Sequence, residues 1–245
     1  MMTWRDQGLV IALRPHSENS AIVEVLTQAH GRHAGVVRGA TSSKRSAHLQ
    51  LGNEIAVTWS ARLEDHLGSY TIEPIRAHVP PYLNDRMLNA GLGALCAMAH
   101  QHLPERLVLD AFYDRTYDLI TTPEPQSWPE RYVLWELALL EFLGFGLDLS
   151  SCAVTGRLDE LRYISPRTGC AVSAQGAGAW APKLFAFPDL LKGTLPTTAE
   201  DLKNAFDIME HFLTREVAHE TRSGQLPAAR ARFVTSALSR KSLAG

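Results

Sequence analysis

The hydrophobic pattern of this chain changes its period once, near Pro80 and Pro81, and this change limits the folds available to it. Before the two prolines, short apolar runs recur with turn residues between them at roughly 8–15-residue intervals, which is typical of strands. After them, apolar residues recur at helical spacing. The pattern therefore predicts an α+β protein with a β-rich first part and a mainly α-helical second part.

Five runs in the first part are predicted to be strands. Most are joined by stretches that contain no apolar pattern of helical length, which suggests a small five-stranded barrel. Pro74 assigns the last run to a sheet edge or a strand end, because proline has no amide hydrogen for a ladder. The predicted strands are Gly8–Arg14, Ala21–Thr27, His33–Arg38, Asn53–Ser60 and Ser69–Ile75.

The second part is predicted to contain helices on either side of an irregular segment, residues 148–193. Ser127 and Glu130 have the spacing of a capping box at the start of one helix. We therefore divide the chain into a barrel domain, residues 1–80, and a helical domain, residues 81–245. The predicted helices are Met87–Ala99, Leu107–Ile120, Ser127–Leu143, Thr198–Thr214 and Pro227–Leu238.

The composition is that of an ordinary folded protein. Hydrophobic residues make up 45% and charged residues 20% of the chain, which argues against disorder. Three cysteines, an odd number without paired spacing, argue against a disulfide framework and favour a reducing compartment. No apolar run has the length of a signal-peptide core or a membrane span. We expect a soluble, cytoplasmic protein without a membrane partner.

The clearest functional signal is a stretch without carboxylates. No Asp or Glu lies between Val25 and Asn53, although the whole chain has a net charge of −2. Such a basic strip on a small β-rich segment is typical of a protein that follows a phosphate backbone. A solvated loop and strand face would give the same pattern. The strip contains Arg32, Arg38, Lys44 and Arg45, together with His30, His33 and His48.

Hydroxyl and aromatic side chains near the strip bear on the same hypothesis. The loop at residues 41–46 is rich in Ser and Thr, which can donate to phosphate oxygens. Candidates for stacking on bases are few: Trp4, Trp59 and Tyr70. Trp59 lies on an alternating strand, and this position favours the core. We therefore expect contacts to phosphates rather than readout of bases.

Catalytic and metal-binding patterns are not found in the sequence. Neither Cys152 nor Cys170 begins a C-x-x-C pair, and structural zinc needs four ligands. There is no G-x-S-x-G elbow, H-E-x-x-H pair or phosphate-binding loop. Acidic pairs such as Asp114 and Asp118 are explained by solvated helix faces, and a hydrolase or transferase built on them would need a pocket of convergent carboxylates. We expect no enzyme activity, no metal and no cofactor.

Three segments, taken in order, resemble the RecO family of bacterial DNA repair proteins over nearly the whole chain. Residues 8–45 contain S-E-x-S, H-G-R and R-G-A elements that resemble the family's opening strands. Residues 135–157 resemble its central helix and the following turn, and residues 163–174 resemble the loop after that.

The resemblance implies an N-terminal OB-fold barrel and an accessory role in recombinational repair. Such proteins bind single- and double-stranded DNA and anneal complementary strands. They engage the C-terminal tail of the single-stranded-DNA-binding protein and work with RecR to load the RecA recombinase. A cytoplasmic, nucleoid-associated location follows. The alternative is a protein-interaction adaptor whose barrel is structural and does not bind DNA.

One departure from the family pattern concerns zinc. Some members have a four-cysteine zinc site after the central helix. Here Cys152 stands at the first ligand position, and Thr155, Ser173 and Gly176 stand at the other three. The resemblance therefore implies a degenerate, zinc-less zinc-finger-like loop within residues 148–193.

A second departure concerns the groove that binds the acidic, apolar-ended tail of the partner protein. Val133 and Leu134 stand where a relative has arginines. A basic tail, residues 222–241, is compatible with this role or with DNA contact. The residues assigned to the groove by resemblance are Arg131 and Arg230 as the cations, with Tyr132, Trp135 and Leu139 as the apolar wall.

Overall fold

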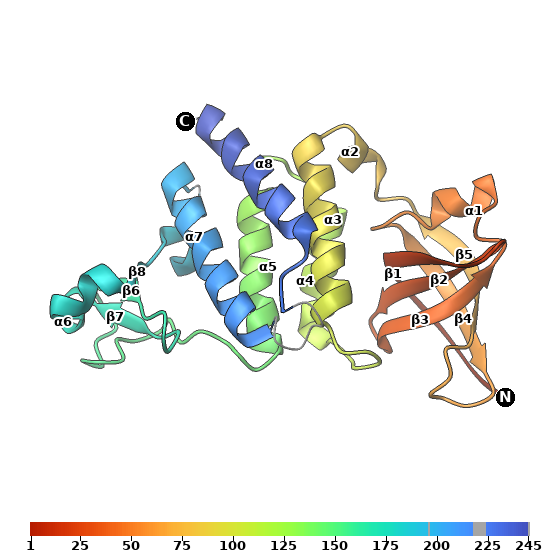
Figure 1. The fold of residues 1–245 in the computed structure, drawn as a ribbon, viewed down its shortest axis with the longest axis horizontal. Helices are drawn as coiled ribbons and strands as arrows, with labels where there is room; N and C mark the ends of the chain where they lie inside the picture. Colours follow the sequence, from red (N-terminus) through yellow and green to blue (C-terminus); the bar gives the residue numbers. More distant parts are fainter. Residues whose placement is uncertain (196, 218–223, 245) are drawn as a thin grey trace. The chain divides into compact units, whose positions relative to one another are not determined.

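The structure is a computed structural model that describes residues 1–195, 197–217 and 224–244 (Figure 1). It divides into two compact units. Unit 1 is Met1–Pro125 with Pro227–Phe233, and unit 2 is Gln126–Leu226 with Val234–Gly245. The change from strands to helices falls at Pro80, as predicted, while unit 1 continues through the first helices to Pro125.

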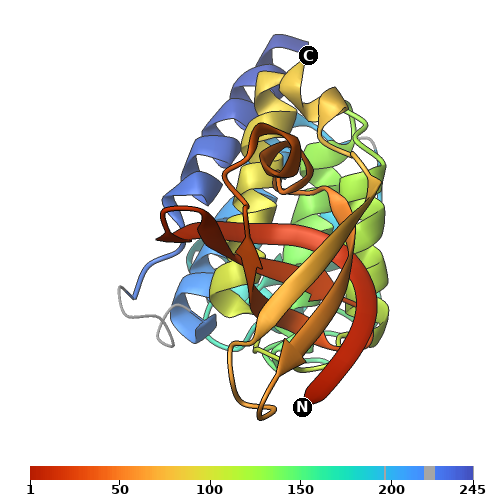
Figure 2. The same cartoon turned by 90° about the vertical axis from the view of Figure 1, so that its right-hand side faces the viewer.

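The first 76 residues form a closed five-stranded barrel, which confirms the predicted α+β class (Figure 2). The strand order is β1-β2-β3-β5-β4, and β4 pairs back onto β1. Its interior is filled by valines, Ile55 and Trp59, all nearly inaccessible to solvent. The strands are β1 (Met2–Ser17), β2 (Ser20–Thr27), β3 (Gly31–Arg38), β4 (Glu54–Ala61) and β5 (Ser69–Arg76).

β1 is longer than predicted and continues through Pro15. Pro15 pairs with Ala21 of β2, next to a register shift. On its other side β1 pairs with β4 only from Met2 to Leu9. Past Leu9, β1 pairs with β2 alone among the described strands. A strand with one open side tolerates a proline, because only one side needs a full set of amide donors.

The barrel is least tightly paired between β3 and β5. These parallel strands pair only at Val36–Ser69 and Val37–Tyr70. Gly68 immediately precedes β5 at φ +63°, and a Cβ there would lie 2.3 Å from Nε1 of Trp59. Glycine is required by both the backbone angle and the close approach of the indole.

A short helix, α1 (Ser43–His48), stands where the sequence indicated only a polar loop. Ser42 precedes it with an extended backbone, and none of its six residues is buried. A helix of this length has no apolar face to repeat along the sequence, so periodicity could not reveal it. It places three basic side chains, Lys44, Arg45 and His48, on the surface of the barrel.

Helices complete unit 1 and form most of unit 2. In unit 1, Asp85 caps α3 by accepting hydrogen bonds from the amides of Met87 and Leu88. Among the described residues, no helix has the length and apolar character needed to cross a membrane. The helices are α2 (Pro80–Leu83), α3 (Arg86–His102), α4 (Asp110–Thr121), α5 (Trp128–Phe142), α6 (Ala174–Ala177), α7 (Ala199–Phe212) and α8 (Ala228–Ala244).

Unit 2 also contains the irregular segment predicted at residues 148–193. It is a three-stranded sheet in the order β7-β6-β8 with short helical turns. The strands are β6 (Leu161–Ile164), β7 (Ala171–Ser173) and β8 (Phe185–Ala186), and the turns are η1 (Gly178–Lys183) and η2 (Asp189–Lys192). A further turn, η3 (Leu213–Val217), follows α7.

The predicted capping box at the start of α5 is wrong in its contacts. Ser127 occupies the N-cap position, but its side chain makes no cap hydrogen bond. Glu130 is 1% exposed and accepts hydrogen bonds from Oγ1 of Thr197 (3.0 Å) and Nζ of Lys241 (2.6 Å). A buried carboxylate needs a cation or several donors, and these partners, distant in sequence, replace the local cap. Thr198, in contrast, caps α7 by accepting from the amide of Asp201.

Candidate nucleic-acid interface

Three of the four predicted DNA-contacting residues lie together on the barrel surface. Arg38 ends β3, Gly39 turns the chain at φ +68°, and Lys44 and Arg45 follow in α1. The guanidinium of Arg45 donates to the carbonyl oxygen of Arg38, which holds the turn and α1 together. All three basic side chains are exposed. The result is a compact group of cations at the end of β3 that is open to solvent.

A polar notch of about 550 Å³ lies beside Arg38. It is bounded by the β1–β2 turn, the end of β3 and the start of β5, and no lining residue is Asp or Glu. Hydroxyls of Ser17 and Ser20, 2.5 Å apart, and the side chain of Asn19 offer neutral donors. Glu18, at the tip of the same turn, does not line the notch. Hydroxyl, amide and guanidinium donors are the groups that contact nucleic-acid backbones.

Arg32, the fourth predicted contact, begins β3 at its other end. It lies six positions before Arg38 along the strand, a distance of about 20 Å. Its side chain is 13% exposed and contacts Oε2 of Glu24 at 2.7 Å. Its Nε also donates to the carbonyl oxygen of Leu103 at 2.7 Å, and Nη2 lies 3.5 Å from Oε1 of Glu105. Its charge is therefore engaged inside unit 1, and its contact with DNA stays a prediction.

The partner of Arg32 could have been found from the hairpin register. Leu26 pairs with Arg32 and Glu24 pairs with Ala34, so Glu24 and Arg32 are diagonal neighbours on one sheet face. Burial raises the pKa of Glu24, but hydrogen bonds from His100 and Arg32 lower it below its ordinary value. Glu24 stands directly before the carboxylate-free stretch, and a count that starts at Val25 leaves it out.

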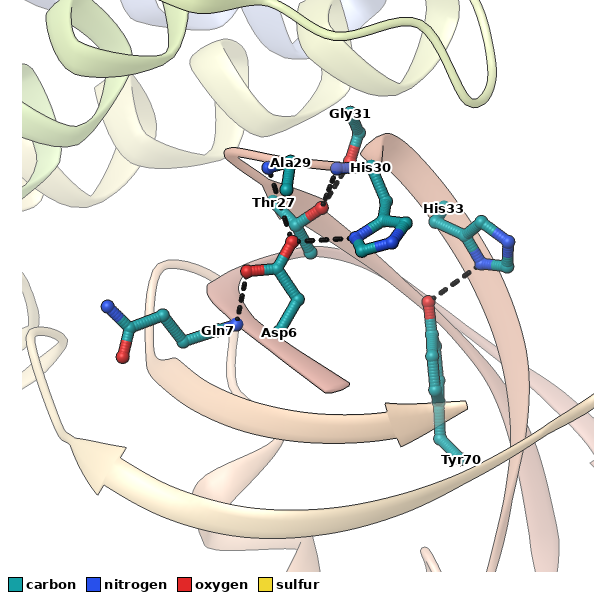
Figure 3. A network of polar contacts seen from close by, with 8 residues as sticks. All are labelled: Asp6, Gln7, Thr27, Ala29, His30, Gly31, His33 and Tyr70. Carbon is teal, nitrogen blue, oxygen red and sulfur yellow. Dashed lines mark hydrogen bonds and ion pairs between the residues drawn. The ribbon is translucent and has the colours of Figure 1, made fainter. Parts of the chain in front are cut away.

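Two of the histidines in the strip, His30 and His33, make polar contacts with other side chains of the barrel (Figure 3). His30 stacks on Trp4 at 3.9 Å between ring centroids, and its Nδ1 lies 2.9 Å from Oδ2 of Asp6. His33 is buried, with Nδ1 2.9 Å from the hydroxyl of Tyr70. Burial lowers the pKa of His33 to about 4, so this ring is neutral at physiological pH. His33 therefore adds no positive charge to the surface.

The aromatic candidates are mostly core residues. Trp59 is 1% exposed, its Nε1 donates to the carbonyl oxygen of Leu67 at 3.0 Å, and Tyr70 is also buried. Trp4 is the only one of the three that is partly exposed. The sequence correctly favoured the core for Trp59. The surface around Arg38 therefore carries exposed basic side chains, whereas Trp59 and Tyr70 are buried.

The residues assigned to the partner-tail groove are placed as follows. Tyr132, Trp135 and Leu139 are at most 2% exposed and lie on α5 in unit 2, where the ring of Tyr132 packs near Trp135 and Phe206. Arg131 is partly exposed on the same helix. Arg230 is 2% exposed and is grouped with unit 1. Their role in binding stays a prediction. Arg222 of the basic tail lies outside the described residues.

The four positions that align with a zinc site do meet in unit 2. Amides of Thr155 and Ser173 donate to Sγ of Cys152 at 3.4 and 3.2 Å, and the amide of Gly176 donates to Oγ of Ser173 at 3.1 Å. Oγ1 of Thr155 lies 3.4 Å from the same Oγ. One thiol and two hydroxyls do not match the ligand set of structural zinc. Among the described residues, no cluster of three His, Cys, Asp or Glu could hold a metal.

The barrel topology defines the class of protein. Five strands closed in this order, followed by helices, form an OB-fold α+β protein. Family models described as Recombination protein O N terminal and Recombination protein O C terminal match residues 1–78 and 83–225. The chain therefore belongs to the RecO family of DNA repair proteins, as the resemblance implied.

Curated relatives agree with the family models over almost the whole chain. The DNA repair protein RecO of Cereibacter sphaeroides is 47% identical over 234 residues, covering 96% of this chain and 98% of that protein. Its counterpart in Ruegeria sp. is 44% identical, covering 95% and 97%. The one in Jannaschia sp. is 42% identical over 244 residues, covering 100% and 99%.

Proposed function

We propose that this chain is a recombination mediator without an active site, which binds DNA backbone through the notch and α1 and anneals complementary strands. The observation that supports this most is the exposed group Arg38, Lys44 and Arg45 beside a notch without carboxylates. Cations and neutral donors placed side by side can follow successive phosphates. The shortage of exposed aromatic rings fits binding that does not depend on base sequence.

The proposed mechanism is electrostatic. Each phosphate neutralised by a basic side chain releases condensed counterions, so affinity falls with the logarithm of salt concentration. Three contacts to a single strand predict a slope of about −2, or a loss of about 20-fold between about 50 and 200 mM salt. Annealing follows if the bound strand keeps its bases free, since the notch contacts the backbone only.

Protein partners complete the proposal. We propose that the chain engages the tail of the single-stranded-DNA-binding protein through Arg131, Arg230 and the apolar residues of α5, and that it works with RecR to promote RecA loading. The support is membership of the family. The proposed location is the cytoplasm, in association with the nucleoid.

The test is fluorescence anisotropy of a labelled single-stranded oligonucleotide with the full chain. The triple variant R38E/K44E/R45E should lose at least tenfold in affinity and reduce the salt slope. The control is the charge reversal Arg86→Glu. Arg86 is exposed at the start of α3, and this variant should bind DNA as the unmodified chain does. Unchanged affinity in the triple variant would favour the adaptor alternative, in which the barrel is structural.

A second assay addresses the partner proposal. Complementary oligonucleotides coated with the single-stranded-DNA-binding protein are annealed with that protein's tail either present or removed. Annealing that depends on the tail supports partner contact. Loss of annealing on naked strands in the triple variant isolates the DNA contact, because no partner protein is then present.

A further inference from the structure

Unit 1 contains an open groove of about 630 Å³ that the proposed DNA contacts do not use. One wall is β1 from Ile11 to Arg14, and the opposite wall is a face of α3 that includes Asn89, Gly93 and His100. The groove therefore lies between a strand of the barrel and the first long helix of the same unit. The polar notch beside Arg38 is a separate feature with a different lining.

The strand wall has an open edge. Beyond Leu9, β1 pairs with β2 on one side, and on the other side Val10 still exchanges backbone hydrogen bonds with Gly52 and Asn53, so the edge is open from Ile11 onward. Unpaired strand edges are templates for another extended chain, and proteins normally protect them. The stretch Ile11–Arg14 lies both on this edge and in the groove. Among the described strands, none covers it.

Most of the residues that line the groove are apolar, and the helix contributes a glycine, Gly93, to its wall. Leu13 and Leu83 line it and are 47% and 62% exposed. Gly93 lies inside α3, and a Cβ built there meets nothing within 4 Å. Glycine destabilises a helix interior relative to alanine, and packing among the described residues gives no reason for it here. Close approach of another backbone would supply one.

The charged side chains that line the groove indicate which net charge its ligand should carry. Its one acidic lining residue, Glu24, is buried and contacts Arg32 and His100 at 2.7 and 2.8 Å. Arg14 lines the groove and is exposed. The basic helix α1 contributes Ser46 to the same lining. The exposed lining side chain with a fixed charge is therefore the guanidinium of Arg14, which favours an acidic ligand.

We propose that this groove binds an acidic, extended peptide segment of a partner protein. The segment adds a strand to the open edge of β1 and places alternate apolar side chains over Gly93. From Asn89 to His100 the helix spans about 17 Å, which is the length of about five extended residues. This surface is distinct from the predicted residues of α5 and does not depend on DNA binding.

The experiment measures binding of a fluorescein-labelled hexapeptide that alternates glutamate and leucine, using the full chain. Gly93→Leu extends a side chain into the groove from a position where an added Cβ meets nothing within 4 Å, and it should lower affinity at least tenfold while keeping the helix intact. Ala111→Leu, on an exposed position of α4 outside the groove, is the matched control and should change affinity less than twofold. Circular dichroism verifies the helical content of both variants.

Two further measurements do not depend on Gly93. Arg14→Glu should weaken the acidic peptide about threefold to tenfold and improve binding of a lysine–leucine peptide. Methylation of alternate peptide amides should abolish binding if the peptide pairs with β1. The proposal is overturned if Gly93→Leu and Arg14→Glu both bind the acidic peptide as the unmodified chain does, or if the unmodified chain does not bind it. It is also overturned if Gly93→Leu impairs single-stranded DNA binding instead of peptide binding. The DNA affinity of R38E/K44E/R45E tests the proposed DNA contact and has no bearing on the peptide groove.

Discussion

Replacing Arg32 by alanine separates a structural role from a DNA contact, because the sequence assigned this residue to DNA and the structure surrounds it with protein groups. The guanidinium contacts Glu24, Glu105 and the carbonyl oxygen of Leu103. The Glu24 side chain is 6% exposed. Removal of the Arg32 guanidinium would leave the buried carboxylate of Glu24 with His100 as its remaining partner.

The magnitude follows from that burial. Removing one member of a buried ion pair costs roughly 3–5 kcal/mol. Since His100 still contacts Glu24, we expect the lower end, a loss of about 3 kcal/mol in the free energy of unfolding. Glu24→Gln in the Arg32→Ala background removes the unpaired charge and should recover part of the loss. Urea unfolding followed by circular dichroism measures all three variants.

Lys44→Ala is the matched comparison. Its side chain is exposed on α1, so its stability should change by less than about 0.5 kcal/mol while its DNA affinity falls. Arg32→Ala should lower the stability strongly and change DNA affinity little. The reasoning is refuted if Arg32→Ala unfolds at the same urea concentration as the unmodified chain and weakens DNA binding as much as Lys44→Ala does.

Two further expectations test the interior of unit 1. The pKa of Glu24 is lowered in the folded chain, so its contribution to stability is present above about pH 4.3, the ordinary value for glutamate, and is lost as the pH falls below it. The urea concentration at the midpoint of unfolding should therefore change less between pH 6 and pH 3.5 in Glu24→Gln than in the unmodified chain. The same pH dependence in both proteins would contradict this. Asn53 is buried, accepts from the amides of His78 and Val79 and donates to Ala47. Asn53→Ala should cost about 2–3 kcal/mol in thermal unfolding, and a change under about 0.5 kcal/mol would show that water replaces these bonds.

Much of the fold could be predicted because it follows from local periodicity. The five strands and the long helices appear where the alternation and the helical spacing placed them. The exceptions have physical reasons. β1 runs through Pro15 because its second side is open there, and α1 is too short to show a period. Glu130 leaves the predicted capping box because its Oε1 accepts hydrogen bonds from distant Thr197 and Lys241 instead.

The candidate site divides in the same way. Its basic residues were visible as a stretch without carboxylates, but their state was not. His33 loses its charge through burial against Tyr70, and Arg32 is neutralised by Glu24 from the neighbouring strand. The convergence of Cys152, Thr155 and Ser173 was implied only by resemblance until the hydrogen bonds showed it.

The sequence by itself determined the α+β class, the position at which strands give way to helices, the family and the local excess of positive charge. These properties are set by residues near one another in the chain. Only the tertiary structure decided which cations face solvent, because the carboxylate that pairs with Arg32 is brought in by strand pairing. It also decided that β1 keeps an open edge opposite Gly93, since an unpaired edge is defined by what the rest of the fold leaves uncovered.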